Sequence, residues 1–150
     1  MLEQLWPVIV TTLAPVAELR GGIPLGIAMG LDPALVIATA FIVNCLVFFP
    51  VYIGLTLLYE RFFIRFAWCR KLIERIHKKG RPYVERYGIL GLAVFVGIPL
   101  PATGAWTGTG IAWVLGLDWK RSFLAVCLGV LIAAVIVSAV SLGVLGAVSS

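Results

Sequence analysis

Two short stretches of irregular sequence interrupt otherwise apolar regions of this chain. The first holds Glu18 and Arg20 followed by two glycines, and the second is the Pro-Leu-Pro-Ala-Thr-Gly stretch that begins at Pro99. In lipid, backbone that leaves the helix survives only where protein or water satisfies its N–H and C=O groups. Two such breaks in one small chain therefore indicate broken helices that line a transport site.

The composition is typical of a membrane protein. Of 150 residues, 61% are hydrophobic and 13% are charged, and the mean hydropathy is +1.07. A soluble domain carries about 25% charged residues. Cys45, Cys69 and Cys127 match no metal-ligand or redox spacing. No metal site, cofactor motif, catalytic triad or phosphate loop is visible, so we expect a single membrane domain over 1–150 that is not an enzyme.

Charge is concentrated in residues 60–87, which hold nine of the twelve Lys and Arg residues and three of the seven acids. Basic segments beside membrane spans stay in the cytoplasm, so we expect a multi-pass protein of the cytoplasmic (inner) membrane with this loop in the cytoplasm. Phe62, Phe63 and Phe66 among the basic residues predict an amphipathic helix on anionic inner-leaflet headgroups. Nucleic acid is not an expected partner, because apolar segments flank the basic run.

Four apolar blocks span residues 4–31, 33–59, 88–117 and 122–150. The second opens with Asp32-Pro33, a helix N-cap followed by proline. It and the fourth exceed the ~20 residues that a membrane helix needs. The third has 30 uncharged residues with seven glycines, too many for one crossing and too few for two. It predicts a re-entrant hairpin that enters and leaves on one side, and the first block, broken near Glu18, predicts another.

An internal repeat supports this arrangement. A shift of 86 residues superposes Pro15 on Pro101, Gly22 on Gly108, and Gly30-Leu31-Asp32 on Gly116-Leu117-Asp118. The predicted fold is an all-α integral membrane protein with two inverted repeats, 1–59 and 88–150. Each repeat is a re-entrant helical hairpin followed by a transmembrane helix, and the basic amphipathic cytoplasmic helix over 60–87 joins them.

Glu18 and Arg20 are the only ionisable residues inside the apolar blocks apart from the terminal Glu3. Ionisable groups inside a membrane are costly and point to function. Two interpretations stay open. Glu18 could bind and release a proton during transport while Arg20 holds an anionic group or returns Glu18 to its charged state. Alternatively, the two could pair with each other, or cap exposed backbone at the hairpin tip, and never move.

The second hairpin has no charge but offers hydroxyl groups, an indole face and glycines that permit close backbone approach. Asn44, on the helix that follows the first hairpin, is predicted to hydrogen-bond hairpin backbone. The predicted substrate- or ion-binding residues are Glu18, Arg20, Gly21, Gly22, Pro24, Asn44, Pro99, Pro101, Thr103, Gly104, Trp106, Thr107 and Gly108.

At residues 18–25 and 99–108 the chain resembles the small multidrug export protein family, small prokaryotic membrane proteins related to the DedA superfamily. The resemblance covers nearly the whole chain and implies two re-entrant hairpins in inverted repeat. For DedA relatives it also implies ion-gradient-dependent transport or flipping of lipids, notably polyprenyl phosphates. DedA proteins usually carry an arginine in the second hairpin, where this chain has Gly104 and Trp106 opposite Glu18 and Arg20.

These observations predict a small secondary transporter, proton- or ion-coupled, that acts as a homodimer because one short chain has little mass to enclose a pathway. The substrate is either a small amphipathic molecule or a lipid phosphate. Arg20 favours the anionic lipid, whereas Glu18 and Trp106 favour a cation. A non-transporting membrane scaffold or assembly factor is the alternative.

Overall fold

The computed structural model describes residues 2–100 and 103–148, and these residues form helices and turns without a strand. The elements are α1 (Leu2–Leu13), α2 (Glu18–Ala28), α3 (Pro33–Leu46), α4 (Phe48–Arg61), the 3₁₀ turn η1 (Phe63–Arg65), α5 (Ala67–Gly97), α6 (Ala105–Val114) and α7 (Trp119–Val148). The prediction of an all-α chain is confirmed.

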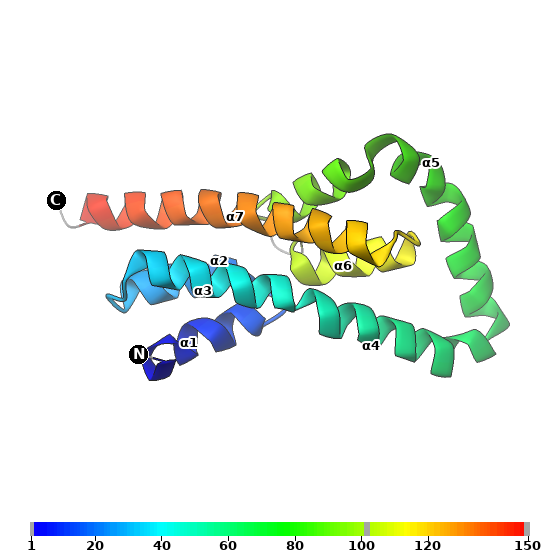
Figure 1. The fold of residues 1–150 in the computed structure, drawn as a ribbon, viewed down its shortest axis with the longest axis horizontal. Helices are drawn as coiled ribbons and strands as arrows, with labels where there is room; N and C mark the ends of the chain where they lie inside the picture. Colours follow the sequence, from blue (N-terminus) through cyan, green and yellow to red (C-terminus); the bar gives the residue numbers. More distant parts are fainter. Residues whose placement is uncertain (1, 101–102, 149–150) are drawn as a thin grey trace.

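Two segments are long and apolar enough to cross a membrane. One covers 33–65, with a mean hydropathy of 2.4, and the other is α7, with 2.9. The sequence predicts a transmembrane helix over 33–59 with Asn44 and Pro50 as its only interruptions, and the structure divides it into α3 and α4 at Val47. Pro50 explains the division, because it has no N–H to offer the carbonyl of Leu46. The two pieces nevertheless follow one another along the long axis (Figure 1).

The amphipathic helix predicted over 60–87 is not one continuous helix in the structure. Helix α4 ends at Arg61, η1 follows, and α5 begins at Ala67. Helix α5 then changes direction at Gly88, whose backbone (φ 43°, ψ −132°) is non-helical and lies where glycine is favoured. The basic part of α5 thereby ends where the predicted apolar block 88–117 begins.

Each apolar block that was predicted to be broken forms a helical hairpin. Helices α1 and α2 pack together in the first, and the apolar end of α5 packs with α6 in the second. Figure 1 shows the two tips meeting near the middle of the long axis, with α2 and α6 running from there toward opposite ends. Glycines allow close packing inside both hairpins, since a Cβ at Gly22 would collide with Thr12 and one at Gly108 with Val96.

The 86-residue spacing recurs in the backbone. Gly30 and Gly116 end α2 and α6 with φ of 74° and 71°. The N–H of Leu31 bonds Gly26 O at 3.1 Å, and that of Leu117 bonds Ala112 O at 3.0 Å, the same glycine-terminated helix end twice. The helices that follow also begin at equivalent residues, because the carbonyl of Asp32 accepts the Val36 N–H at 3.0 Å and that of Asp118 accepts the Ser122 N–H at 2.9 Å. Asp32 is in addition the predicted side-chain N-cap of α3, since its carboxylate accepts the Leu35 N–H.

Buried positions also repeat at this spacing, which indicates that α2 and α6 occupy comparable environments. The buried residues of α2 include Glu18, Leu19, Gly22, Ile23 and Gly26, and their counterparts Gly104, Ala105, Gly108, Thr109 and Ala112 are all buried. The core between the hairpins and spans is apolar, with Val8, Ile23, Val36, Phe48, Val96, Val126 and Val130 among its members.

Candidate functional site

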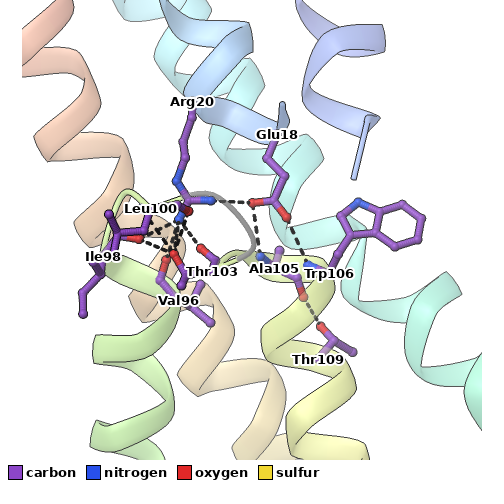
Figure 2. A network of polar contacts seen from close by, with 9 residues as sticks. All are labelled: Glu18, Arg20, Val96, Ile98, Leu100, Thr103, Ala105, Trp106 and Thr109. Atoms are coloured by element: carbon purple, nitrogen blue, oxygen red, sulfur yellow. Dashed lines mark hydrogen bonds and ion pairs between the residues drawn. The ribbon is translucent and has the colours of Figure 1, made fainter. Parts of the chain in front are cut away.

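The tips of the two hairpins are held together by the side chains of Glu18 and Arg20 (Figure 2). Residue i and residue i+2 do not share a face of a regular helix. They meet here because Glu18 has φ of 48°, the only positive φ at a non-glycine residue in the described part of the chain. Arg20 Nη1 lies 3.3 Å from Glu18 Oε2. The side chains are 16% and 3% exposed, respectively, so this is a buried ion pair.

Glu18 reaches across to the start of α6. Its carboxylate accepts the backbone N–H of Ala105 at 3.3 Å and of Trp106 at 3.2 Å. The first N–H groups of a helix lack intrahelical partners and carry a partial positive charge. A carboxylate from the first hairpin therefore caps a helix of the second hairpin.

Arg20 caps the other side of the same break, because it binds carbonyl groups at the end of α5. Its Nη2 donates to the carbonyls of Val96 (3.2 Å) and Ile98 (2.8 Å), and to the carbonyl of Thr103. The last carbonyls of a helix lack partners and carry a partial negative charge. The acid and the base thus lie at the two helix ends whose partial charges they complement, and together they bridge the break in the second hairpin.

Thr103 organises the second tip from within. Its hydroxyl donates to the carbonyl of Ile98 at 2.6 Å or of Leu100 at 2.8 Å, and it accepts the Leu100 N–H at 3.3 Å. Arg20 Nη2 lies 3.3 Å from the same hydroxyl. Pro99 is exposed beside it, and Pro101 lies outside the described residues.

The remaining predicted site residues near the tips have packing roles around this bridge. A Cβ at Gly104 would collide with the Glu18 carboxylate, and one at Gly21 would lie 3.0 Å from Thr11 and Ala17 side-chain atoms. The buried Asn44 side chain lies near the Glu18 carboxylate, and its predicted hydrogen bond to hairpin backbone stays a prediction. Its Oδ1 has no partner among the described residues.

Trp106 and Thr107 are only partly brought to the site. The backbone of Trp106 binds Glu18, but its indole points away from Arg20 (Figure 2) and its Nε1 has no partner in the described residues. Thr107 is exposed and lines a separate cavity that also includes Ile76 of α5. Within the described residues, no three of the His, Cys, Asp and Glu side chains gather as metal ligands would.

A groove of about 610 Å³ runs from the bridge toward the end of the molecule where α7 terminates. Arg20, Pro24 and Pro99 lie at its inner end, while Ile136, Val140 and Val144 of α7 line one wall. Among the described residues that line it, Ser141 is the only polar one apart from Arg20. Arg20 Nε has no partner among the described residues, so the guanidinium retains a donor beyond those used in the bridge.

Sequence reasoning missed several partners at this site. Capping of exposed backbone by Glu18 and Arg20 was one of the predicted interpretations, but the particular carbonyls that Arg20 binds, those of Val96 and Ile98, have no side-chain signal. The wall supplied by α7 was also missed, because its apolar residues are indistinguishable in sequence from lipid-facing ones.

Comparison with known proteins identifies the family. The family model described as Putative small multi-drug export protein matches residues 18–136, beginning at the glutamate that caps α6. Comparisons with curated proteins and with solved structures give no match. Because the family model covers most of the chain, including both hairpin tips, this protein belongs to the small multi-drug export protein family.

Proposed function

We propose that the protein is a membrane secondary transporter for amphipathic anions. The observation that carries the proposal is the position of Arg20 at the inner end of an otherwise almost apolar groove. A substrate with an apolar body would lie along α7 and place its anionic group at the guanidinium. Arginine offers several donors in a planar fork and keeps its charge at all relevant pH values.

In this proposal the hairpins are re-entrant and the two repeats are inverted. The opposite directions of α2 and α6, and the meeting of the tips midway, support the arrangement (Figure 1). With the basic part of α5 in the cytoplasm, the groove opens in the half of the membrane remote from the cytoplasm. Broken helices that meet near the midplane of inverted repeats are a recurrent plan for transporters.

Glu18 supplies the proposed proton coupling. As a carboxylate it accepts two backbone N–H groups of α6 and pairs with Arg20. Protonation would remove the negative charge that attracts the N–H groups of α6 and the guanidinium of Arg20. The contact between the tips would then loosen, and Arg20 would become free to bind a substrate anion. One protonatable side chain thereby links the contact between the tips to anion binding.

Between the substrates left open by the sequence, the geometry favours an anion such as a lipid phosphate. Arg20 lines the groove, whereas Glu18 and Trp106 do not. A cationic substrate in this groove would meet a guanidinium and no carboxylate. The homodimer, and the contact of residues 60–87 with anionic headgroups, stay predictions.

The test is a flipping assay in proteoliposomes with a fluorescent NBD-labelled polyprenyl phosphate and, in parallel, uptake of the cationic amphiphile ethidium. Wild-type protein should move the phosphate, and Arg20→Gln should abolish this movement. Arg70→Gln is the matched control, because it removes one positive charge from an exposed pair with Glu74. Uptake of ethidium alone would overturn the anionic substrate, and movement of neither probe would favour the scaffold.

A further inference from the structure

The open groove between α2 and α7 has a counterpart at the other end of the molecule. Under the 86-residue shift α2 corresponds to α6, and the second half of α7 corresponds to α4. The corresponding place therefore lies between α4 and α6, which contact each other as α2 and α7 do. We infer that this place is a second access path to Arg20 and that Trp113 is the gate that closes it. The inference rests on the proposed transport function.

Trp113 joins α6 to α4 by two contacts. Its indole Nε1 donates to Thr56 Oγ1 at 3.0 Å, and its ring meets Tyr59 edge-on, with centroids 5.4 Å apart and planes at 71°. Thr56 in turn donates to the Tyr52 carbonyl at 2.9 Å, which fixes the hydroxyl so that a lone pair faces the indole. The side chain spans the space between the two helices.

The equivalent residue in the first repeat leaves its space open. Ile27 corresponds to Trp113 and lines the open groove. Thr56 and Tyr59 correspond to Leu142 and Leu145 of α7, neither of which can accept a hydrogen bond through its side chain. One half of the molecule therefore carries a closing contact that the other half lacks.

The equivalence of Ile27 and Trp113 is also supported by backbone hydrogen bonds, which do not involve the Trp113 side chain. The N–H of Gly30 bonds Ile27 O at 3.0 Å, and that of Gly116 bonds Trp113 O at 3.0 Å, so the two positions hold the same place in the same helix end. An apolar cavity of about 300 Å³ lies beside Trp113 and Tyr59, and its other walls come from α4, η1 and the start of α5, including Trp68. Trp113 therefore borders empty space on the side of α5.

Both paths end at the same bridge between the hairpin tips, so they cannot be independent. Swinging α6 away from α4 would carry the second tip, and with it the groups that hold Glu18 and Arg20. Opening the path between α4 and α6 should therefore accompany narrowing of the groove between α2 and α7, as in a two-state equilibrium that a gate residue biases.

The test uses two pairs of spin labels that the repeat makes equivalent. One pair, at Ala28 and Val144, spans the open groove, and the other, at Val114 and Leu58, spans the closed path. Each pair is introduced as cysteines into full-length protein in lipid nanodiscs after the three native cysteines are replaced, and the distances are measured by pulsed electron paramagnetic resonance. Transport of the NBD-labelled lipid is measured on the same variants without labels.

Trp113→Ile, which installs the residue of the open half, should add a population with a longer 58–114 distance and a shorter 28–144 distance. Thr56→Val keeps the shape of the side chain but removes the hydroxyl that accepts from Trp113 and donates to the Tyr52 carbonyl within α4. Loss of the bond between the helices should shift the ratio of populations about five-fold in the same direction. Trp119→Ile, the loss of an exposed tryptophan at the start of α7, should change neither distance.

A widening of the 58–114 pair alone in Trp113→Ile would overturn the gate, since it would show only local loosening. Unchanged distributions in both Trp113→Ile and Thr56→Val would also overturn it. Either result could coexist with Arg20-dependent lipid movement by the wild type, so failure of the gate is distinguishable from failure of the transport function.

Discussion

The two hairpins have the same backbone plan but contribute opposite kinds of group to their contact. The first supplies a full negative and a full positive charge, Glu18 and Arg20. The second supplies helix-end N–H groups and carbonyls, together with the glycine at residue 104 that makes room for the carboxylate. At the equivalent positions Glu18 faces Gly104, so the approach of the tips requires that the repeats differ. A symmetric pair of carboxylates would collide and repel.

This contrast explains how two charges are tolerated inside an otherwise apolar core. An isolated buried ion is expensive, but an acid and a base that pair with each other and with unsatisfied helix ends remove several uncompensated groups at once. Glu18 adopts φ of 48° to make these contacts, a backbone conformation that costs of order 1–2 kcal/mol outside glycine. Strain of this kind is typical of functional sites.

The largest predicted effect on stability and transport comes from the charged hairpin, and the equivalent change in the uncharged hairpin should have a smaller effect. Arg20→Ala should destabilise the protein by about 3–5 kcal/mol and abolish transport, because it leaves the Glu18 carboxylate buried without its partner. Trp106→Ala, at the equivalent position of the second hairpin, should cost less and retain measurable transport. Thermal unfolding in detergent and lipid movement in proteoliposomes check both. Equal losses from the two variants would contradict the division of roles.

Gly104→Ala should be the next most damaging change. Its methyl group would collide with the Glu18 carboxylate, and such overpacking costs about 1–3 kcal/mol. Gly110→Ala on the same helix is the matched control, since a Cβ there meets nothing within 4 Å. It should be neutral or stabilising by up to ~1 kcal/mol. The measurement is the melting temperature of each variant. An equal decrease in both would show that alanine destabilises α6 in general and that the collision with Glu18 is not the cause.

Glu18→Gln keeps the shape of the side chain but removes its charge. Both hydrogen bonds to α6 lose their charged acceptor, so we expect a loss of about 1–2 kcal/mol in stability. The rate of lipid movement by the wild type should respond to an imposed proton gradient, whereas that of the variant should not. The assay compares initial rates with and without the gradient. A persistent response in Glu18→Gln would remove Glu18 from proton coupling.

The smallest predicted effect concerns the internal order of the second tip. Thr103→Val removes the hydroxyl that binds Ile98 and Leu100 and should cost about 1 kcal/mol. Thr107→Val, an exposed threonine nearby, should stay within ~0.5 kcal/mol of the wild type. Unfolding curves for the two variants suffice, and indistinguishable curves would show that the hydroxyl of Thr103 does not organise the tip.

Much of this arrangement could be predicted because the constraints of a membrane are visible in sequence. Pro99, the charge of Glu18 and Arg20, and the repeated Gly-Leu-Asp turn are side-chain or composition signals. They predicted the broken segments and the all-helical fold. The first break was predicted around Glu18–Pro24, but it covers residues 14–17, and Gly21-Gly22 lies inside α2.

The remaining contacts depend on atoms that carry no sequence signal. The carbonyls that Arg20 binds belong to backbone, and the positive φ of Glu18 occurs at a residue type that rarely adopts it. The interruption by Pro50 was visible in sequence, but the exact residue at which α3 ends, Leu46, was not. Likewise, the bond between Trp113 and Thr56 joins residues 57 apart that only the packing of α4 on α6 brings together.

The most direct test of the central claim is a distance measurement across the two tips in a lipid bilayer. Protein carrying ¹³C at the Glu18 carboxyl carbon and ¹⁵N at the Trp106 amide would be reconstituted for solid-state NMR with dipolar recoupling. The contact of 3.2 Å between Glu18 Oε1 and Trp106 N predicts a measurable dipolar coupling between the two labels, which Gly104→Ala should abolish. Absence of coupling in wild-type protein would contradict the capping of α6 by Glu18.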